Sequence, residues 1–213
     1  MKNLGTVFND EQELLKAILD IHNNGQDLDC DPMFNKGMFY KKILNKPKYR
    51  FDLEAIDKGY DAKYGDATNL PLPQNSIHSI ILDPPFMFGT HGQTKNNVIN
   101  KRYTMFDNFE QLENCYKGIL KEAYRVLEKN GLCIFKCQDY TDSKTTMTHC
   151  LVYQWANELG FYAKDLAILI KPNKIFNGNL IQRHLRKTHS YFFVFIKKQV
   201  TSKGIRKTTQ FHH

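Results

Sequence analysis

Apolar positions are spaced in two ways along the chain, and the change in spacing separates helices from strands. Between residues 9 and 25 they recur every three or four positions, and Asn9, with Gln12 three residues later, is expected to cap that helix. The same spacing predicts a short helix over 38–44, a long one from Phe109 that Gly131 ends, and another over 145–159. Apolar and β-branched runs predict strands near 28–30, at 49–53, near 62–64, and at 77–82, 132–136, 163–170 and 191–196.

This alternation of helices and strands is typical of a doubly wound α/β fold. A length of 213 residues with 41% hydrophobic content suits one domain, and no linker or internal repeat divides it. We expect an N-terminal helix within 1–25, a substrate loop over 87–107, a basic hairpin loop over 172–189 and a basic tail over 199–213. With no signal peptide and no apolar run near 18 residues, the protein is expected to be cytoplasmic, without a membrane partner. Five cysteines without a C-x-x-C pair suit reduced thiols, and no metal site is expected.

One short motif carries the clearest chemistry. Asp83-Pro84-Pro85-Phe86 directly follows the apolar run 80–82. An aromatic amine such as adenine N6 is a weak nucleophile because its lone pair is delocalised into the ring, so it needs acceptors for its hydrogens. An ionised Asp83 has only acceptor lone pairs, and the Pro84 carbonyl stays out of local turns because Pro85 has no N–H. Since Phe86 can stack on the base, these four residues predict a catalytic site for methylation of an amino group.

Around this motif the chain resembles the class I S-adenosylmethionine-dependent amino-methyltransferases, whose fourth motif is Asp/Asn-Pro-Pro-aromatic. Residues 65–71 followed by 75–83 resemble the third motif leading into the fourth, and 122–131 resembles the helix-to-strand crossover. More closely, the chain is similar to small phage-type and bacterial candidate DNA methylases, through Asp31-Pro32 with Lys36-Gly37, residues 135–139 and residues 184–191. The resemblance implies a Rossmann-like fold, with a seven-stranded, mostly parallel sheet and a C-terminal antiparallel hairpin.

The same resemblance implies S-adenosyl-L-methionine as the cofactor. Asp66 would accept a hydrogen bond from its adenine amino group beside the backbone N–H of Ala67, and Asp52 would bind the ribose hydroxyls. Most members have a glycine-rich turn after the first strand, whereas this chain has one glycine between residues 26 and 58. The expected cofactor-binding residues are Asp31, Gly37, Asp52, Glu54, Asp66 and Ala67.

Basic residues are concentrated at the C-terminal end. The 48 residues after Asp165 contain ten Lys or Arg and no acid, while the first 165 contain twenty basic and 22 acidic residues. Such asymmetry favours a polyanionic partner, because phosphate contacts supply most of the sequence-independent affinity for nucleic acid. The expected nucleic-acid-binding residues lie in the loops 87–107 and 172–189. They are Lys95, Lys101, Arg102, Tyr103, Arg183, His184, Arg186, Lys187 and His189.

The first hypothesis for the substrate is adenine N6 in DNA, because it fits the resemblance to small DNA methylases. Cytosine N4 uses the same motif. RNA is the main alternative, at adenine N6 or guanine N2, and a protein glutamine or a non-catalytic nucleic-acid-binding role also stays open. If DNA is the substrate, so small a chain predicts short or loose sequence specificity, or a partner that supplies recognition. The sequence leaves the oligomeric state undetermined.

Overall fold

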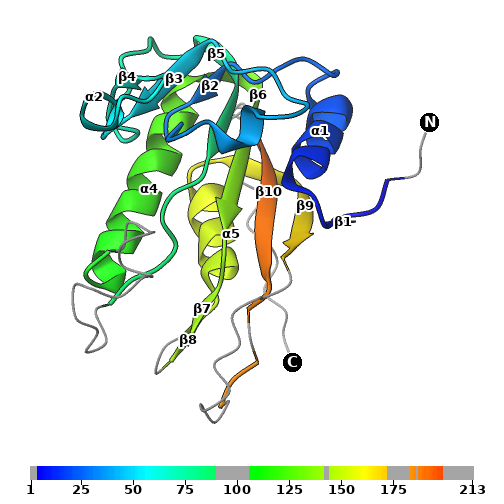
Figure 1. Cartoon of the computed structure of the whole chain (residues 1–213), viewed down its shortest axis with the longest axis vertical. Helices are drawn as coiled ribbons and strands as arrows, with labels where there is room; N and C mark the ends of the chain where they lie inside the picture. Colours follow the sequence, from blue (N-terminus) through cyan, green and yellow to red (C-terminus); the bar gives the residue numbers. More distant parts are fainter. Residues whose placement is uncertain (1–3, 90–105, 142–143, 172–182, 186, 199–213) are drawn as a thin grey trace, which may run out of the picture.

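The computed structural model describes residues 4–89, 106–141, 144–171, 183–185 and 187–198 (Figure 1). In this part of the chain, eight strands form one sheet in the order β1-β9-β10-β6-β5-β2-β3-β4. Their bounds are β1 Val7–Phe8, β2 Cys30–Asp31, β3 Tyr49–Asp52, β4 Lys63–Tyr64, β5 Ile77–Leu82, β6 Leu127–Cys137, β9 Phe161–Ile170 and β10 His189–Lys197. A separate two-stranded sheet joins β7 (Tyr140–Thr141) to β8 (Thr145–Thr146).

The sheet is parallel except at β10, which runs antiparallel to both of its neighbours, β6 and β9. The expected α/β fold with a C-terminal antiparallel hairpin is therefore confirmed. The expected number of strands was wrong by one, because β1 pairs in parallel with the edge of β9. The N–H of Ile168 also donates to the Thr6 carbonyl at 2.7 Å, which extends this edge pairing.

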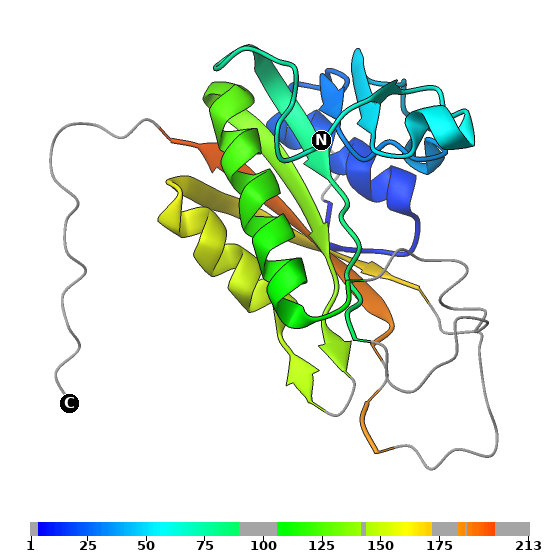
Figure 2. The ribbon, with the colours of Figure 1, turned by 90° about the vertical axis from the view of Figure 1, so that its left-hand side faces the viewer.

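Two layers of helices enclose the sheet. Figure 2 shows α4 (Phe109–Val126) and α5 (Thr148–Glu158) on one face and α1 (Glu11–His22) on the other. Side chains alternate accordingly along β5, so that Ile80 and Leu82 lie in the core under α4, while Ile81 lies in the core under α1. The central strands are buried on both faces, as their continuous apolar sequences predict.

The N-cap of α1 is Asp10, and the prediction of Asn9 was wrong. Asp10 Oδ1 accepts hydrogen bonds from the N–H groups of Gln12 and Glu13, at 2.8 and 3.1 Å. Asn9 and Asp10 are both residue types that suit the capping role, and Asp10 takes it with extended backbone angles, φ −119° and ψ 130°. The helix then ends at His22.

The predicted helix over 38–44 is reduced to one 3-10 turn, η1 (Met38–Tyr40). Beyond it, the backbone N–H groups of Lys42 and Ile43 both donate to the side-chain oxygen Oε1 of Gln12, at 2.8 and 2.9 Å. These donors would otherwise bond to carbonyls of a preceding helical turn. The Gln12 side chain on α1 therefore accepts the hydrogen bonds that a longer helix would have made within itself. This contact between distant residues cannot be predicted from the local sequence.

Three further boundaries differ from the predictions. The helix α4 ends at Val126 rather than at Gly131, because residues from Leu127 onward already belong to β6 and pair with β5. The segment 145–146 is a strand, so α5 begins only at Thr148. The first core strand starts at Cys30 rather than near residue 28, while α2 (Ala55–Lys58) is a single turn before β4. Within the described residues, none of the helices combines the length and apolarity needed to cross a lipid bilayer.

Candidate functional site

Three acidic residues lie where parallel strands end at the same edge of the sheet. Asp31 is the last residue of β2, Asp52 is the last residue of β3, and Asp83 directly follows β5. Because ligands of open α/β sheets bind outside the carboxyl ends of the strands, this edge is the candidate functional site. The structure thus brings the predicted catalytic motif and two of the predicted cofactor-binding acids to one edge.

Asp83 forms an ion pair that the sequence did not reveal. Its Oδ2 accepts a hydrogen bond from Nζ of Lys136, on β6, at 3.0 Å. The same Nζ lies 2.9 Å from Oε1 of Glu11, the first residue of α1. Burial raises the pKa of Asp83 above its ordinary value, and the charge of Lys136 only partly offsets that effect. Among the described residues, the cation in direct contact with this half-buried carboxylate is Lys136.

The rest of the motif is held by the neighbouring helix α4. The hydroxyl of Tyr116 donates to the Pro85 carbonyl at 3.0 Å, while no donor among the described residues bonds to the Pro84 carbonyl. Pro84 is buried, and Pro85 and Phe86 are half-buried. The backbone around Pro84 is therefore fixed while its carbonyl stays available as an acceptor.

The loop that follows the motif is closed at its base. The N–H of Gly89 donates to the Phe106 carbonyl at 2.9 Å, and the N–H of Phe106 donates to the Met87 carbonyl at 3.0 Å. Phe88 also packs edge-on against Phe109 and Tyr140, with ring centroids 5.6 and 5.0 Å apart. The two ends of the predicted substrate loop therefore meet beside the motif, although residues 90–105 lie outside the described part of the chain.

Asp31 is almost fully buried, with a relative exposure of 2%. Its Oδ2 accepts from the Tyr40 hydroxyl at 2.8 Å, and its Oδ1 accepts from the N–H of Met33 at 3.0 Å. Burial raises the pKa of Asp31 to about 7, against these two hydrogen bonds, and the charges of Asp83 and Asp52 add to the increase. Near neutral pH this carboxyl group is therefore poised between its neutral and ionised forms.

The turn after β2 is built with few glycines, as the sequence showed. Asn35 and Gly37 both adopt left-handed backbone angles, with φ of 48° and 62°. A Cβ on Gly37 would lie 2.6 Å from the ring of Phe34, so this position requires glycine. The N–H of Asn35 donates to Oδ2 of Asp52 at 2.9 Å, and the N–H of Glu54 donates to Oδ1 at 2.8 Å. Asp52 therefore fastens the turn to the end of β3.

The remaining predicted cofactor residues have free capacity for a ligand. Asp66 is exposed, and its Oδ1 accepts both the N–H and the hydroxyl of Thr68 at 2.8 Å, so Oδ2 has no partner in the described residues. Ala67 is buried and Glu54 is exposed. Carboxylate oxygens at the ends of neighbouring strands suit the hydroxyl and amino donors of S-adenosyl-L-methionine, so the residues present fit this group.

Four of the predicted nucleic-acid-binding residues are described, and they lie at the start of β10 or just before it. Arg183 and His184 are exposed, and Lys187 and His189 are half-buried. The hairpin loop is closed at its base by the N–H of Lys171, which donates to the Thr188 carbonyl at 2.7 Å. The other predicted residues lie outside the described part of the chain, namely Lys95, Lys101, Arg102, Tyr103 and Arg186.

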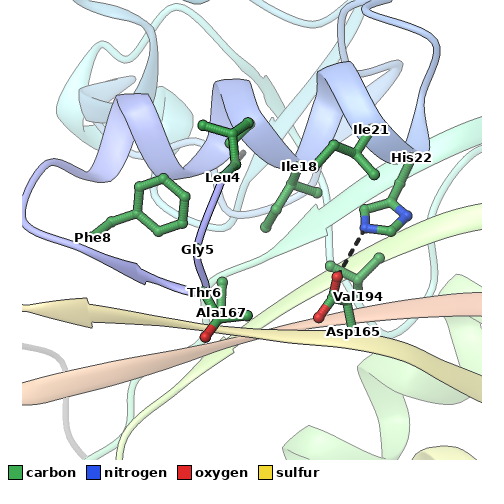
Figure 3. Close-up of a pocket in the computed structure, with 11 residues that line it drawn as sticks. Leu4, Gly5, Thr6, Phe8, Ile18, Ile21, His22, Asp165, Ala167 and Val194 are labelled. Atoms are coloured by element: carbon green, nitrogen blue, oxygen red, sulfur yellow. Dashed lines mark hydrogen bonds and ion pairs between the residues drawn. The ribbon is translucent and has the colours of Figure 1, made fainter. Parts of the chain in front are cut away.

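A small cavity of about 60 Å³ lies on the α1 face, between α1, β1 and the strand pair β9 and β10 (Figure 3). Mostly apolar side chains line it, and His22 Nε2 approaches Asp165 Oδ2 to 3.3 Å at one end. None of the predicted site residues lines it. It is too small for a nucleobase or a cofactor. Among the described residues, no group of three His, Cys, Asp or Glu side chains could hold a metal ion.

The sequence predicted neither Lys136, the cation that pairs with Asp83, nor Glu11, the acid that pairs with Lys136. Lys136 belongs to the segment 135–139 that carries part of the resemblance, but no role was predicted for it, and Glu11 was predicted only as part of the first helix. One signal was available, since Lys136 is a charged residue within the otherwise apolar run 132–137. A lysine in a strand that is buried on both faces needs a nearby anion.

A family model described as DNA methylase, of the N6 and N4 type, matches residues 77–212. The chain belongs to this DNA methylase family. The matched segment begins with β5 and contains the Asp83 motif, Lys136 and the hairpin of β9 and β10. No curated protein matches the chain significantly.

Solved structures with a similar arrangement include several methyltransferases. A candidate DNA modification methylase from Thermus thermophilus, solved with S-adenosyl-L-methionine, is 19% identical over 68% of this chain and 57% of its own, with a TM-score of 0.45. The cytosine-N4-specific PvuII DNA methyltransferase is 15% identical over 64% and 48%, with a TM-score of 0.46. A SAM-dependent methyltransferase from Archaeoglobus fulgidus is 14% identical over 88% and 95%, with a TM-score of 0.47. This chain thus spans little more than half the length of the Thermus protein.

Proposed function

We propose that the protein transfers a methyl group from S-adenosyl-L-methionine to an exocyclic amino group of a nucleobase in DNA, with adenine N6 as the first choice. One observation carries the proposal. At the end of β5, Asp83 Oδ1 and the adjoining Pro84 carbonyl are two acceptors without a donor among the described residues, in a member of the DNA methylase family. An amino group has two hydrogens for two such acceptors.

The cofactor would be held along the ends of β2, β3 and β4. Asp52 and Glu54 would accept from its ribose hydroxyls, and Asp66 with the N–H of Ala67 would bind its adenine. The turn from Asp31 to Gly37 would lie against its methionine part. When bound, S-adenosyl-L-methionine supplies a methyl group that its sulfonium already activates, so the protein residues need only bind and align.

The target amine would be aligned by the motif itself. Asp83 and the Pro84 carbonyl would accept its two hydrogens, which returns the nitrogen lone pair toward the methyl group, while Phe86 would stack on the base. Such alignment can remove about 7 to 11 kcal/mol of the activation barrier. A base inside a duplex cannot reach Asp83, so the nucleotide would have to be flipped out of the helix.

The experiment that tests this proposal is transfer of labelled methyl groups from S-adenosyl-L-methionine to methylation-free genomic DNA and, in parallel, to unmodified total RNA. Nucleoside mass spectrometry then identifies the product. We expect N6-methyladenine from DNA. N4-methylcytosine would keep the activity and change the base, label in RNA alone would replace DNA as the substrate, and no label in either would contradict the proposal.

The variant Asp83→Ala tests the catalytic role directly, because it removes one of the two acceptors. We expect kcat to fall at least about 100-fold, as when one oriented hydrogen-bonding group is lost from other active sites. Calorimetry should show that the cofactor still binds. Asp20→Ala, at an exposed acid on α1, is the control and should keep full activity. Substantial activity of the Asp83 variant would exclude Asp83 from the catalytic role.

A further inference from the structure

The ion pair of Asp83 suggests a role for two residues that the motif does not contain. We propose that Lys136 is the positioning residue of Asp83: its ammonium group keeps the carboxylate ionised and turned with Oδ1 toward the substrate amine, and Glu11 fixes the ammonium group. This inference rests on the proposed function, because it explains how Asp83 stays in the form that can accept a hydrogen bond.

Ionisation is the first part of the argument. Side-chain exposure is 30% for Asp83 and 18% for Lys136, so water stabilises either charge only in part. Burial favours the neutral acid, and a protonated carboxyl group would present a donor where the amine needs an acceptor. The 3.0 Å contact with Lys136 Nζ opposes this effect of burial.

Orientation is the second part. Lys136 bonds Oδ2 of Asp83, which leaves Oδ1 without a partner among the described residues. The two carboxylate oxygens are therefore distinguished by the protein before any substrate binds. A carboxylate that rotated freely would lose part of the alignment on which the transfer depends.

The lysine itself is held on several sides. Its Nζ lies 5.1 Å from the ring centroid of Phe39 and 5.7 Å from that of Phe192, and Glu11 Oε1 lies 2.9 Å away. Although burial alone would lower the pKa of Lys136, the charges of Asp83 and Glu11 outweigh it and raise that pKa. Lys136 therefore remains a cation in the pH range where Asp83 titrates.

Other charged or titratable groups near Asp83 come from several of the elements around it. Lys171, after β9, contacts Glu11 Oε2 at 3.4 Å and is 60% exposed, so it acts on Asp83 only from a distance. Within the described ranges, Lys136 is the cation in direct contact with Asp83. In the part of the chain that the structure describes, the groups that interact with Asp83 include Lys136 on β6, Glu11 on α1, Lys171 after β9, Asp31 on β2, Tyr40 on η1 and Tyr116 on α4.

The first test does not require activity. The pKa of Asp83 is measured by carbon-13 NMR of its carboxyl group, assigned with Asp83→Asn. Lys136→Met keeps the length of the side chain but removes its charge, and we expect the titration midpoint of Asp83 to rise by about 1 to 3 pH units. Lys171→Met is the matched control and should shift the midpoint far less. An unchanged midpoint in Lys136→Met would overturn the proposal.

A second variant gives a result even if Lys136→Met fails to fold. Lys136→Met leaves Asp83 and Glu11 facing each other without a cation, which can unfold the site. Lys136→Met combined with Glu11→Gln removes that repulsion, and its Asp83 midpoint should still lie above that of the wild type. A midpoint equal to the wild-type value would again overturn the assignment.

Methyl transfer supplies the readout that a purely structural lysine would not change. In Lys136→Met, the acidic limb of the kcat/KM profile for DNA, which reports ionisation before DNA binds, should shift upward in pH by the same amount as the NMR midpoint, with little change in KM for the cofactor. Lys136→Arg, which keeps the charge, should restore the wild-type limb. A profile that is lower at every pH but unshifted would contradict positioning. If the wild type shows no methyl transfer, the proposed function fails, while the NMR midpoints still decide whether Lys136 controls Asp83.

Discussion

Asp31 is the most deeply buried of the acids predicted to bind the cofactor, and its raised pKa has a consequence for stability. In the unfolded chain this acid titrates near 4, and in the folded protein near 7. Between these values the folded state keeps a proton that the unfolded state has lost. The free energy of unfolding therefore falls as the pH rises from about 4 to about 7.

The corresponding prediction concerns Asp31→Asn, which cannot ionise. Between pH 5 and pH 7, the wild type should lose about 2 to 3 kcal/mol of unfolding free energy relative to this variant, since each pKa unit corresponds to about 1.4 kcal/mol. Urea unfolding of both proteins at the two pH values measures the difference. Parallel pH dependences would show that Asp31 is not protonated in the folded protein at pH 5.

Among the individual residues of the site, Asp83 and the two prolines could be predicted from the sequence, but the residues that hold them could not. The motif is local, so its spacing is visible in one stretch of chain. Lys136 lies 53 residues after Asp83 and Glu11 lies 72 residues before it. Only the folded arrangement of β5, β6 and α1 brings the three residues together. A contact that depends on three separate elements leaves no periodic pattern to detect.

Among the elements, α4 has a part in the site as well as in the core. Tyr116 is fully buried, packs against Phe135 and Trp155, and donates its hydroxyl to the Pro85 carbonyl at 3.0 Å. The same helix carries a second tyrosine, Tyr124, whose hydroxyl donates to the Lys198 carbonyl at 3.1 Å. The helix α4 thus bonds to the site through Tyr116 and to the residue that follows β10 through Tyr124.

This pair provides a matched experiment. Tyr116→Phe keeps the ring but leaves the Pro85 carbonyl unpaired, so we expect a loss of about 1 kcal/mol in unfolding free energy and a lower kcat. Tyr124→Phe should lower stability by a similar or smaller amount and leave kcat unchanged. Denaturant unfolding and methyl-transfer kinetics measure both effects. Equal kcat values for the two variants would show that the motif does not need the α4 bond.

The strands at the centre of the sheet were predictable because burial on both faces leaves continuous apolar runs. Elements whose position depends on contacts with distant residues could not be predicted from the sequence. The segment after η1 follows Gln12 rather than its own helical spacing, and the two residues of β1 pair only because β9 offers an open edge. Local propensity is overridden at such positions by a partner that is remote in sequence.

At the scale of the whole molecule, the uneven charge predicts how DNA binding responds to salt. Arg183 and Lys187 are described basic residues in the predicted hairpin loop. Replacing both by Gln should weaken DNA binding and reduce the slope of log affinity against log salt by about 0.9 for each phosphate that is no longer neutralised. Lys16→Gln with Lys117→Gln, two exposed lysines paired to acids, is the control. Fluorescence anisotropy at several salt concentrations measures the slopes, and an unchanged slope would exclude these two residues from the DNA interface.

The position of β10 between β6 and β9 also determines when the sheet can be completed during synthesis. Both neighbours leave the ribosome before residue 189 does, and each then has an unpaired edge facing the same vacant place. Because β10 is synthesised after both of these strands, the facing edges of β6 and β9 stay unpaired in the nascent chain until β10 emerges. Such edges are templates for pairing with other chains. We therefore expect folding to finish after β10 emerges, and the interval before it to be the period in which the chain most needs a chaperone.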